Sequence, residues 1–172
     1  AVQGVDPSEL QGSIYSVTSA VQASGLDLHP HAAPDGTVTL MFSDMEGFSS
    51  MTERLGDLAA REVIRRHNAI VRERLVAHEG YEVELQGDGF LLAFSSAHAG
   101  LLCAIAIQRA FAAYSEGNPE EPIRVRIGLH TGEAIRDADK FFGKTVILAA
   151  RIASQAKGRE ILGLPVSRVA EP

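Results

Sequence analysis

Two aspartates next to glycines are the first residues whose types and spacing could support chemistry. Asp88 stands in Gly87-Asp88-Gly89, between residues 81–86 and 90–94, where apolar and polar side chains alternate. This pattern predicts a β-hairpin whose tip presents an exposed Asp88, and the glycines let another group approach closely. If the hairpin is considered alone, a turn without a chemical role is the better interpretation.

A second carboxylate changes that balance. Asp44 follows the alternating apolar residues of 38–42 and falls where a strand gives way to Glu46-Gly47 and a helix. If this strand end and the hairpin turn meet at the same edge of a sheet, Asp44 and Asp88 form a site of hard oxygen ligands. Mg²⁺ takes one or two carboxylates and leaves its other positions to water and substrate phosphate. The first hypothesis is therefore a phosphate-handling metal site.

Strands and helices must bring these aspartates together, and the hydrophobic patterns predict both. Their order is β, α, β, β, α, β, α, β, which favours an α+β sandwich of ferredoxin-like kind, with helices packed on a central, mostly antiparallel sheet. The predicted elements are a strand from Thr37, a short helix and then one over 58–78, the hairpin 81–94, a helix over 97–114, a strand over 123–130, a helix over 144–155 and a strand from Glu160.

Residues 1–36 are predicted to form an N-terminal helix and loop, ahead of a domain over 37–172. The residues from Asp6 to Glu9 are typical of a helix start. Leu10, Ile14, Val17 and Val21 follow at steps of four, three and four residues. This apolar stripe either packs on its own domain or pairs with the same helix of a second chain, as a dimer or signal-transducing segment. Both interpretations stand.

Composition limits the classes of function. The chain of 172 residues has 45% hydrophobic and 22% charged residues, which is typical of one soluble domain with a sizeable core. Its net charge of -6 argues against a nucleic-acid-binding surface, so any phosphate site must be local. The single cysteine, Cys103, is predicted to be a packed core thiol, and the absence of a disulfide framework fits the cytoplasm. No uninterrupted apolar run is long enough to span a bilayer, so membrane contact would come only through segments outside this chain.

Charged and titratable groups elsewhere have plainer interpretations. His67 lies on the apolar stripe of the 58–78 helix, where a core histidine is expected rather than a metal ligand. The arginines of that helix alternate with Glu62 and Glu73, which predicts a solvated face.

Four motifs together resemble the catalytic domain of the class III nucleotidyl cyclases, the adenylyl and guanylyl cyclases. In chain order they are FSDMEGFSSMTERLGD, QGDGF, RVRIGLHTGE and FFGKTVILAARI, and they cover residues 37 to about 162. The resemblance implies a head-to-tail homodimer with composite sites at its interface. Each site would convert a nucleoside triphosphate to a cyclic nucleotide and pyrophosphate with two Mg²⁺ or Mn²⁺ ions, which activate the ribose 3′-hydroxyl and stabilise the leaving pyrophosphate.

The resemblance also assigns roles to residues. Asp44 and Asp88 match the metal-binding aspartates, with the backbone of Met45 helping, and Gly47 and Phe48 lie in the matching substrate-binding segment. The other chain of the dimer would supply the purine-selecting residues and an arginine, matched by Arg151, which would stabilise the transferring phosphoryl group.

Position 147 departs from the family pattern. Ile147 stands where the family has a phosphate-contacting asparagine, and the loss of one such donor costs roughly 3 to 4 kcal/mol, or about a hundred- to a thousandfold in rate. We therefore expect weak activity. Lys144 and Arg151 share a helix face with Ile147, so Lys144 could partly compensate. A phosphate-binding lysine that the family has beyond the last helix finds no counterpart before the chain ends.

The purine-selecting pair leaves the substrate open. Adenylyl cyclases have lysine and aspartate where this chain has Glu84 and Lys140, so the charges are reversed. Glu84 could accept hydrogen bonds from guanine N1 and N2, while Lys140 donates to O6. Alternatively, Glu84 and Lys140 pair with each other and close the pocket. Family frequency favours ATP as the substrate and cAMP as the product, whereas Glu84 favours GTP and cGMP.

Two classes of function follow. In the first the domain is a slow, metal-dependent cyclase of intracellular signalling, as the aspartate pair and Arg151 indicate. In the second it is a degenerate cyclase fold that dimerises or binds nucleotide to regulate an attached protein, as Ile147 and Lys140 indicate. The first is the preferred interpretation.

Overall fold

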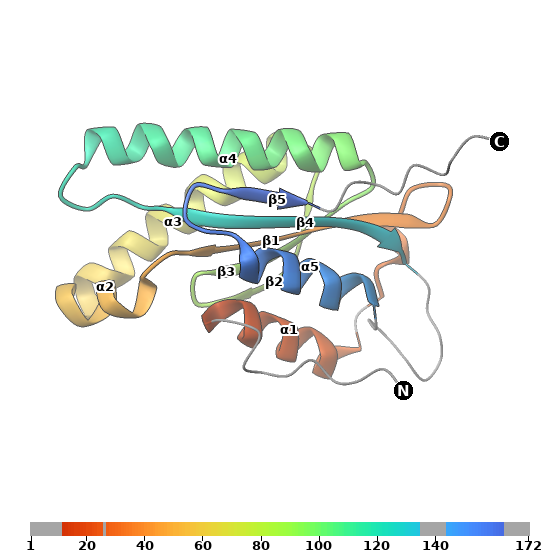
Figure 1. Ribbon diagram of the computed structural model, residues 1–172, viewed down its shortest axis with the longest axis horizontal. Coiled ribbons are helices and arrows are strands. Elements are labelled where there is room, and N and C mark those ends of the chain that lie inside the picture. Colours follow the sequence, from red (N-terminus) through yellow and green to blue (C-terminus); the bar gives the residue numbers. More distant parts are fainter. Residues whose placement is uncertain (1–11, 26, 135–143, 164–172) are drawn as a thin grey trace.

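A five-stranded sheet forms the centre of the computed structural model, which describes residues 12–25, 27–134 and 144–163. The strands run in the order β2-β3-β1-β4-β5, and β4–β5 is the parallel pair in an otherwise antiparallel sheet (Figure 1). This confirms the predicted α+β fold. The strands are β1 (Thr37–Met45), β2 (Tyr81–Gln86), β3 (Gly89–Phe94), β4 (Val125–Glu133) and β5 (Ile161–Gly163).

Helices cover both faces of this sheet. On one face lie α3 (Asp57–Ala77) and α4 (Ala97–Gly117), with α2 (Phe48–Leu55) packed beside α3. On the other lie α1 (Gly12–Ser24) and α5 (Lys144–Gln155), as Figure 1 shows. A 3-10 turn over His29–His31 is the only regular element in the described part of the loop between α1 and β1. The sheet is thus the middle of three layers.

The side chains of the central strand β1 point alternately into two hydrophobic clusters, one on each face of the sheet. Val38, Leu40 and Phe42 point into the cluster formed with α1 and α5, whereas Met41 and Met45 join the cluster formed with α3 and α4. Because both faces of the strand are covered, β1 is buried from its second residue to its last. Side chains alternate along a strand, so Asp44 shares the face of Phe42 and points toward the α1 and α5 layer.

Several boundaries differ from the predicted ones by one to three residues. The N-terminal helix is described from Gly12, and its predicted start at Asp6 lies outside the described residues. The strand predicted from Ile123 begins at Val125 instead. The reason is that the backbone N–H and C=O of Ile123 both bond to the Ser115 hydroxyl, at 3.0 and 3.1 Å, so they are satisfied by the end of α4 rather than by a neighbouring strand.

The interpretations of His67 and of the arginines hold in the structure. His67 is fully buried, and its ring lies 5.4 Å from that of Phe111. Arg65 and Arg66 pair with Glu62 on the exposed face of α3. The helix α4 is long and apolar enough by length and composition to cross a membrane, although no such span was expected. In this fold, however, Cys103, Ile107 and Phe111 of α4 pack in the core against the sheet.

Candidate metal site

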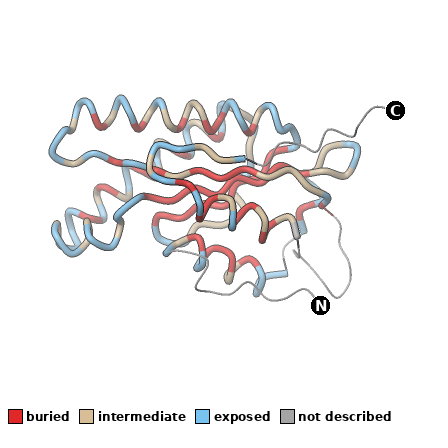
Figure 2. Tube along the Cα trace, viewed as in Figure 1, coloured by how far each residue is buried: buried red, intermediate tan, exposed pale blue. Residues whose placement is uncertain are grey.

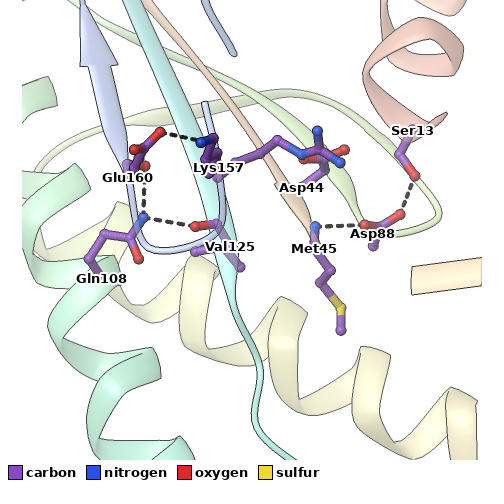
Figure 3. Close-up of polar contacts among 9 residues, drawn as sticks. Ser13, Asp44, Met45, Asp88, Gln108, Val125, Lys157 and Glu160 are labelled. Carbon is purple, nitrogen blue, oxygen red and sulfur yellow. Dashed lines mark hydrogen bonds and ion pairs between the residues drawn. The ribbon is translucent and has the colours of Figure 1, made fainter. Parts of the chain in front are cut away.

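Asp44 and Asp88 meet where the end of β1 lies beside the β2–β3 turn. Asp88 Oδ2 accepts a hydrogen bond from the backbone N–H of Met45 at 2.7 Å, which ties the turn to the residue that follows Asp44 (Figure 3). Both side chains are almost inaccessible, with Asp44 2% and Asp88 1% exposed. The hairpin and the strand therefore bring together the two carboxylates that the sequence singled out, and the Met45 backbone takes part as an orienting donor.

The predicted exposure of Asp88 is wrong. The turn does lie between rigid strands, but α1 covers it, and the Ser13 hydroxyl donates a hydrogen bond to Asp88 Oδ1 (Figure 3). A Cβ atom on Gly89 would lie only 2.7 Å from the Ser13 Cβ, so glycine is needed there for the helix to approach. The Gly-Asp-Gly pattern predicts the turn that carries Asp88, but it contains no information about the helix that packs over this turn.

Asp44 is held by a cation from the neighbouring strand. In the β1–β4 register Arg126 lies opposite Asp44, and its Nε is 2.6 Å from Asp44 Oδ1. Burial raises the pKa of Asp44 to about 7, against the lowering effect of Arg126, and the nearby charge of Asp88 adds to the rise. The carboxyl group of Asp44 thus gains and loses its proton near neutral pH. That Asp88 affects this pKa also shows that the two carboxylates are electrostatically coupled.

The donor set fits a hard divalent cation that shares its coordination with a substrate. Two coupled carboxylates in a buried setting attract such an ion, and Mg²⁺ or Mn²⁺ prefers oxygen ligands. Among the described residues there is no cluster of three or more histidine, cysteine, aspartate or glutamate side chains that could form a closed protein cage. Water and phosphate would therefore complete the coordination. Asp44 and Asp88 would hold the cation, and at present Arg126 contacts Oδ1 of Asp44 and Ser13 bonds to Oδ1 of Asp88.

The remaining residues predicted on this side of the site fall at the start of α2 and in β2. Gly47 precedes α2 in the left-handed conformation, with φ of 71°, and Phe48 packs partly buried against the α3 and α4 core. Glu84 is partly buried in β2 and accepts a hydrogen bond from Gln86 at 3.0 Å. Lys140 lies outside the described residues, so its pairing with Glu84 stays a prediction, as do the substrate contacts of Gly47 and Phe48.

The α5 residues predicted to act on phosphate have different surroundings. Arg151 is exposed, whereas Ile147 is 9% exposed and belongs to the buried side of the helix. Lys144 is the first residue of α5, but its side chain is outside the described part of the structure. An exposed Arg151 is compatible with a role at a second chain, and the structure of a single chain leaves that role a prediction.

Two polar residues of the site, Arg126 and Ser13, were not predicted from the sequence. Arg126 was seen only as a polar position in an alternating strand, and the β1–β4 register is what places it opposite Asp44. The available signal was that Arg126 is a charged residue on a strand whose neighbour, β1, is buried. Ser13 carried no signal, because its contact depends on how α1 docks.

Comparisons with known proteins find similar sequences and structures over most of the chain. The family model of the adenylate and guanylate cyclase catalytic domain matches residues 31–166. An adenylate cyclase of Mycosarcoma maydis is 31% identical over 157 residues, which cover 76% of this chain and 6% of that protein. The chain spans 6 to 46% of the length of the curated relatives that it matches most strongly, and the upper value belongs to an uncharacterized protein of Mycobacterium tuberculosis.

Two solved structures share both fold and detectable sequence identity. A Trypanosoma brucei adenylate cyclase in its monomeric state has a TM-score of 0.64 and 27% identity, over 76% of this chain and 74% of that one. An adenylate/guanylate cyclase/hydrolase from Silicibacter pomeroyi has a TM-score of 0.61 and 29% identity, over 79% and 83% of the two chains.

Proposed function

Because this chain belongs to the adenylate and guanylate cyclase catalytic domain family, we propose that it forms a cyclic nucleotide and pyrophosphate from a nucleoside triphosphate. The observation that carries the proposal is the buried pair Asp44 and Asp88, tied together through the Met45 N–H. Two carboxylates buried so close together are costly for folding, because each opposes the charge of the other although Arg126, Ser13 and the Met45 N–H compensate them in part. A cation-binding role accounts for keeping both.

The residues of this chain would each do one physical task. Asp44 and Asp88 would hold the cations, and the Met45 N–H would fix one oxygen of Asp88 so that the other can serve as a ligand. Bound Mg²⁺ or Mn²⁺ supplies Lewis acidity, which lowers the pKa of the ribose 3′-hydroxyl and stabilises charge on the phosphates. The ribose 3′-oxygen would form the ring-closing bond to the α-phosphorus as the bond to pyrophosphate breaks, and the hydroxyl proton would pass to water.

Arg151 would act from the second chain of a head-to-tail homodimer. Its exposure on α5 leaves the guanidinium able to reach a partner, where it would stabilise charge on the transferring phosphoryl group. Ile147 offers no hydrogen-bond donor, so we expect turnover about a hundred- to a thousandfold slower than with an asparagine in its place. Lys144, one helical turn before Ile147, is the candidate to replace part of that interaction.

We propose ATP as the first substrate and GTP as the second. Relatives named adenylate cyclase support ATP. The carboxylate of Glu84 supports GTP, because it can accept the N1 and N2 protons that guanine offers and adenine lacks at N1. A regulatory module without turnover is the alternative function, and it is favoured by Ile147 and by the contacts of Arg126 and Ser13 with the aspartates.

The test is product formation by the purified chain with Mn²⁺ and either ATP or GTP, measured as cAMP and cGMP at protein concentrations that favour dimers. We expect slow formation of one product, and its loss in Asp88→Asn. The matched control Asp57→Asn, at the exposed start of α3, should keep activity. Metal-dependent nucleotide binding without either product would favour the regulatory module, and the absence of both binding and product would overturn the site.

A further inference from the structure

The helix α1 packs its apolar side into the core, although it precedes the residues 31–166 that the family model matches. Ile14, Val17 and Val21 are each 0% exposed, and they join the apolar cluster that includes Phe42 of β1 and Ala150 of α5. The helix contacts α5, β1, β2 and β3. In Figure 2 its inner side is buried and its outer side is exposed. It therefore lies on the same face of the sheet toward which Asp44 points.

The first turn of α1 is fitted closely to the aspartate pair. The Ser13 hydroxyl bonds to Asp88 Oδ1, and the Ser13 carbonyl oxygen would lie only 3.0 Å from a Cβ atom on Gly89. The Met45 N–H takes Asp88 Oδ2, and Arg126 takes Asp44 Oδ1. Both oxygens of Asp88 are thus engaged by protein donors while α1 is docked. A cation that uses Asp88 Oδ1 must compete with Ser13.

We propose that α1 is a built-in cover of the aspartate pair, which must leave this position before a divalent cation and its triphosphate can bind. The inference rests on the proposed function and adds its regulation. The closed form would be the resting state of the chain. Anything that pulls on or binds the segment ahead of Gly12 would then control the site.

Two features make the cover removable. A 13-residue helix is marginal in water by itself, so its position depends on its contacts with the domain. The loop that follows it contains Gly25 at φ of 63° together with Pro30 and Pro34, and it ends at β1. The helix can therefore move away while its chain connection to β1 is kept, and its release would expose Ile14, Val17 and Val21 together with the sheet residues that they cover. By linkage, a ligand that binds only the open form lowers the affinity of α1 for the domain by the same factor by which docked α1 lowers the affinity for that ligand.

The first experiment measures Mn²⁺ binding to the full chain by calorimetry, without nucleotide. Ser13→Ala removes the donor to Asp88 and leaves the apolar contacts in place, and Ser16→Ala, at an exposed position of the same helix, is the matched control. Since a hydrogen bond to a charged group contributes about 1.5 kcal/mol or more, we expect roughly tenfold tighter Mn²⁺ binding in Ser13→Ala and no change in Ser16→Ala. Equal or weaker binding in Ser13→Ala would overturn the cover.

The second experiment follows hydrogen exchange of α1 in the wild-type chain, which does not depend on any variant folding. Adding Mn²⁺ with a 3′-deoxynucleoside triphosphate, which lacks the attacking hydroxyl and cannot cyclise, should speed amide exchange in residues 12–24 and leave α4 unchanged. Unchanged or slower exchange in α1 upon binding would overturn the cover while leaving the cyclase proposal standing. If neither the wild-type chain nor Ser13→Ala binds Mn²⁺, the proposed metal site is wrong, and the proposed role of α1 as its cover is wrong as well.

Discussion

Asp44 is buried to 2% exposure in a face of the sheet otherwise lined by Val38, Leu40 and Phe42. Desolvation opposes its charge, Arg126 favours it, and Asp88 opposes it again, which leaves the pKa at about 7. Because its pKa is near neutral, Asp44 can hold a proton when no cation is present and release it when one binds. The same balance must appear in the stability of the metal-free protein.

The sign of that effect follows from the two pKa values. The carboxyl group has a pKa of 3.8 when unperturbed and about 7 in the folded protein, so the folded state binds the extra proton between them. Stability from this group is therefore present below the lower value and is lost as the pH rises to the higher one, by up to roughly 1.4 kcal/mol per pH unit. Urea unfolding in a chelator, at several pH values, should show this slope in the wild type and a flatter one in Asp44→Asn. Parallel pH profiles would contradict the assignment.

Cys103 gives a second prediction for a single residue. Its thiol is fully buried in α4, and desolvation raises its pKa to about 12. Because the thiolate is the reactive form, a disulfide reagent at neutral pH should react very slowly with the native chain. In denaturant the same reagent should titrate one thiol per chain, which serves as the control. Rapid labelling under native conditions would mean that α4 opens far more often than its packing implies.

Individual residues differ in how far the sequence could predict them. Asp44 and Asp88 were found because each lies at a recognisable place, a strand end and a Gly-Asp-Gly turn. Arg126 and Ser13 were not, because their roles arise from strand register and from helix docking, neither of which a local pattern encodes. The burial of Asp88 was mispredicted for the same reason.

Among the elements, β4 and α5 approach each other closely where Gly128 faces Ala153. A Cβ atom on Gly128 of β4 would lie 2.3 Å from the backbone nitrogen of Ala153 and 2.5 Å from its Cα. Ala149, Ala150 and Ala153 are all 0% exposed, so small side chains on α5 let its backbone rest on the sheet. The helix that carries Arg151 is thereby held rigidly against the strand that carries Arg126.

This packing predicts that Gly128→Ala destabilises the fold. The added methyl group meets backbone atoms, which cannot move aside as a side chain can, so overpacking should cost about 1 to 3 kcal/mol. Gly117→Ala, at the end of α4 where nothing lies within 4 Å of a Cβ atom, is the matched control and should be neutral or slightly stabilising. Urea unfolding of both variants measures the difference, and equal stability would show that β4 and α5 are less tightly packed than described.

Element boundaries were predicted to within a few residues, and the errors have physical causes. Alternation and helical stripes identified every strand and long helix, because burial on a sheet face or helix face imposes those periods. The start of β4 was missed because the Ser115 side chain of α4 replaces a strand partner for Ile123. A tertiary hydrogen bond of this kind leaves no periodic trace in the sequence.

At the scale of the whole molecule, sequence patterns predicted an α+β fold with helices packed on a mostly antiparallel sheet, but not that helices cover both faces of the sheet or that α1 docks on one of them. The apolar stripe of α1 left two partners open, its own domain or a second chain. In the single chain it packs on its own domain, over the face that carries Asp44 and Asp88. The same face would have to open for the composite sites of a dimer, so dimerisation and release of α1 are expected to be linked.

A head-to-tail homodimer makes a prediction that no single chain can satisfy. If one chain supplies Asp44 and Asp88 and its partner supplies Arg151, then Asp44→Asn and Arg151→Ala should each be inactive alone. Mixed after subunit exchange, half of the dimers are hybrids with one intact site, so about a quarter of the wild-type activity should return. Asp44→Asn mixed with Asp88→Asn is the matched control: both changes fall in the same half of a site, every hybrid site keeps one defect, and no activity should return. Recovery in both mixtures, or in neither while hybrids form, would place Arg151 and the aspartates in a different arrangement from the one proposed.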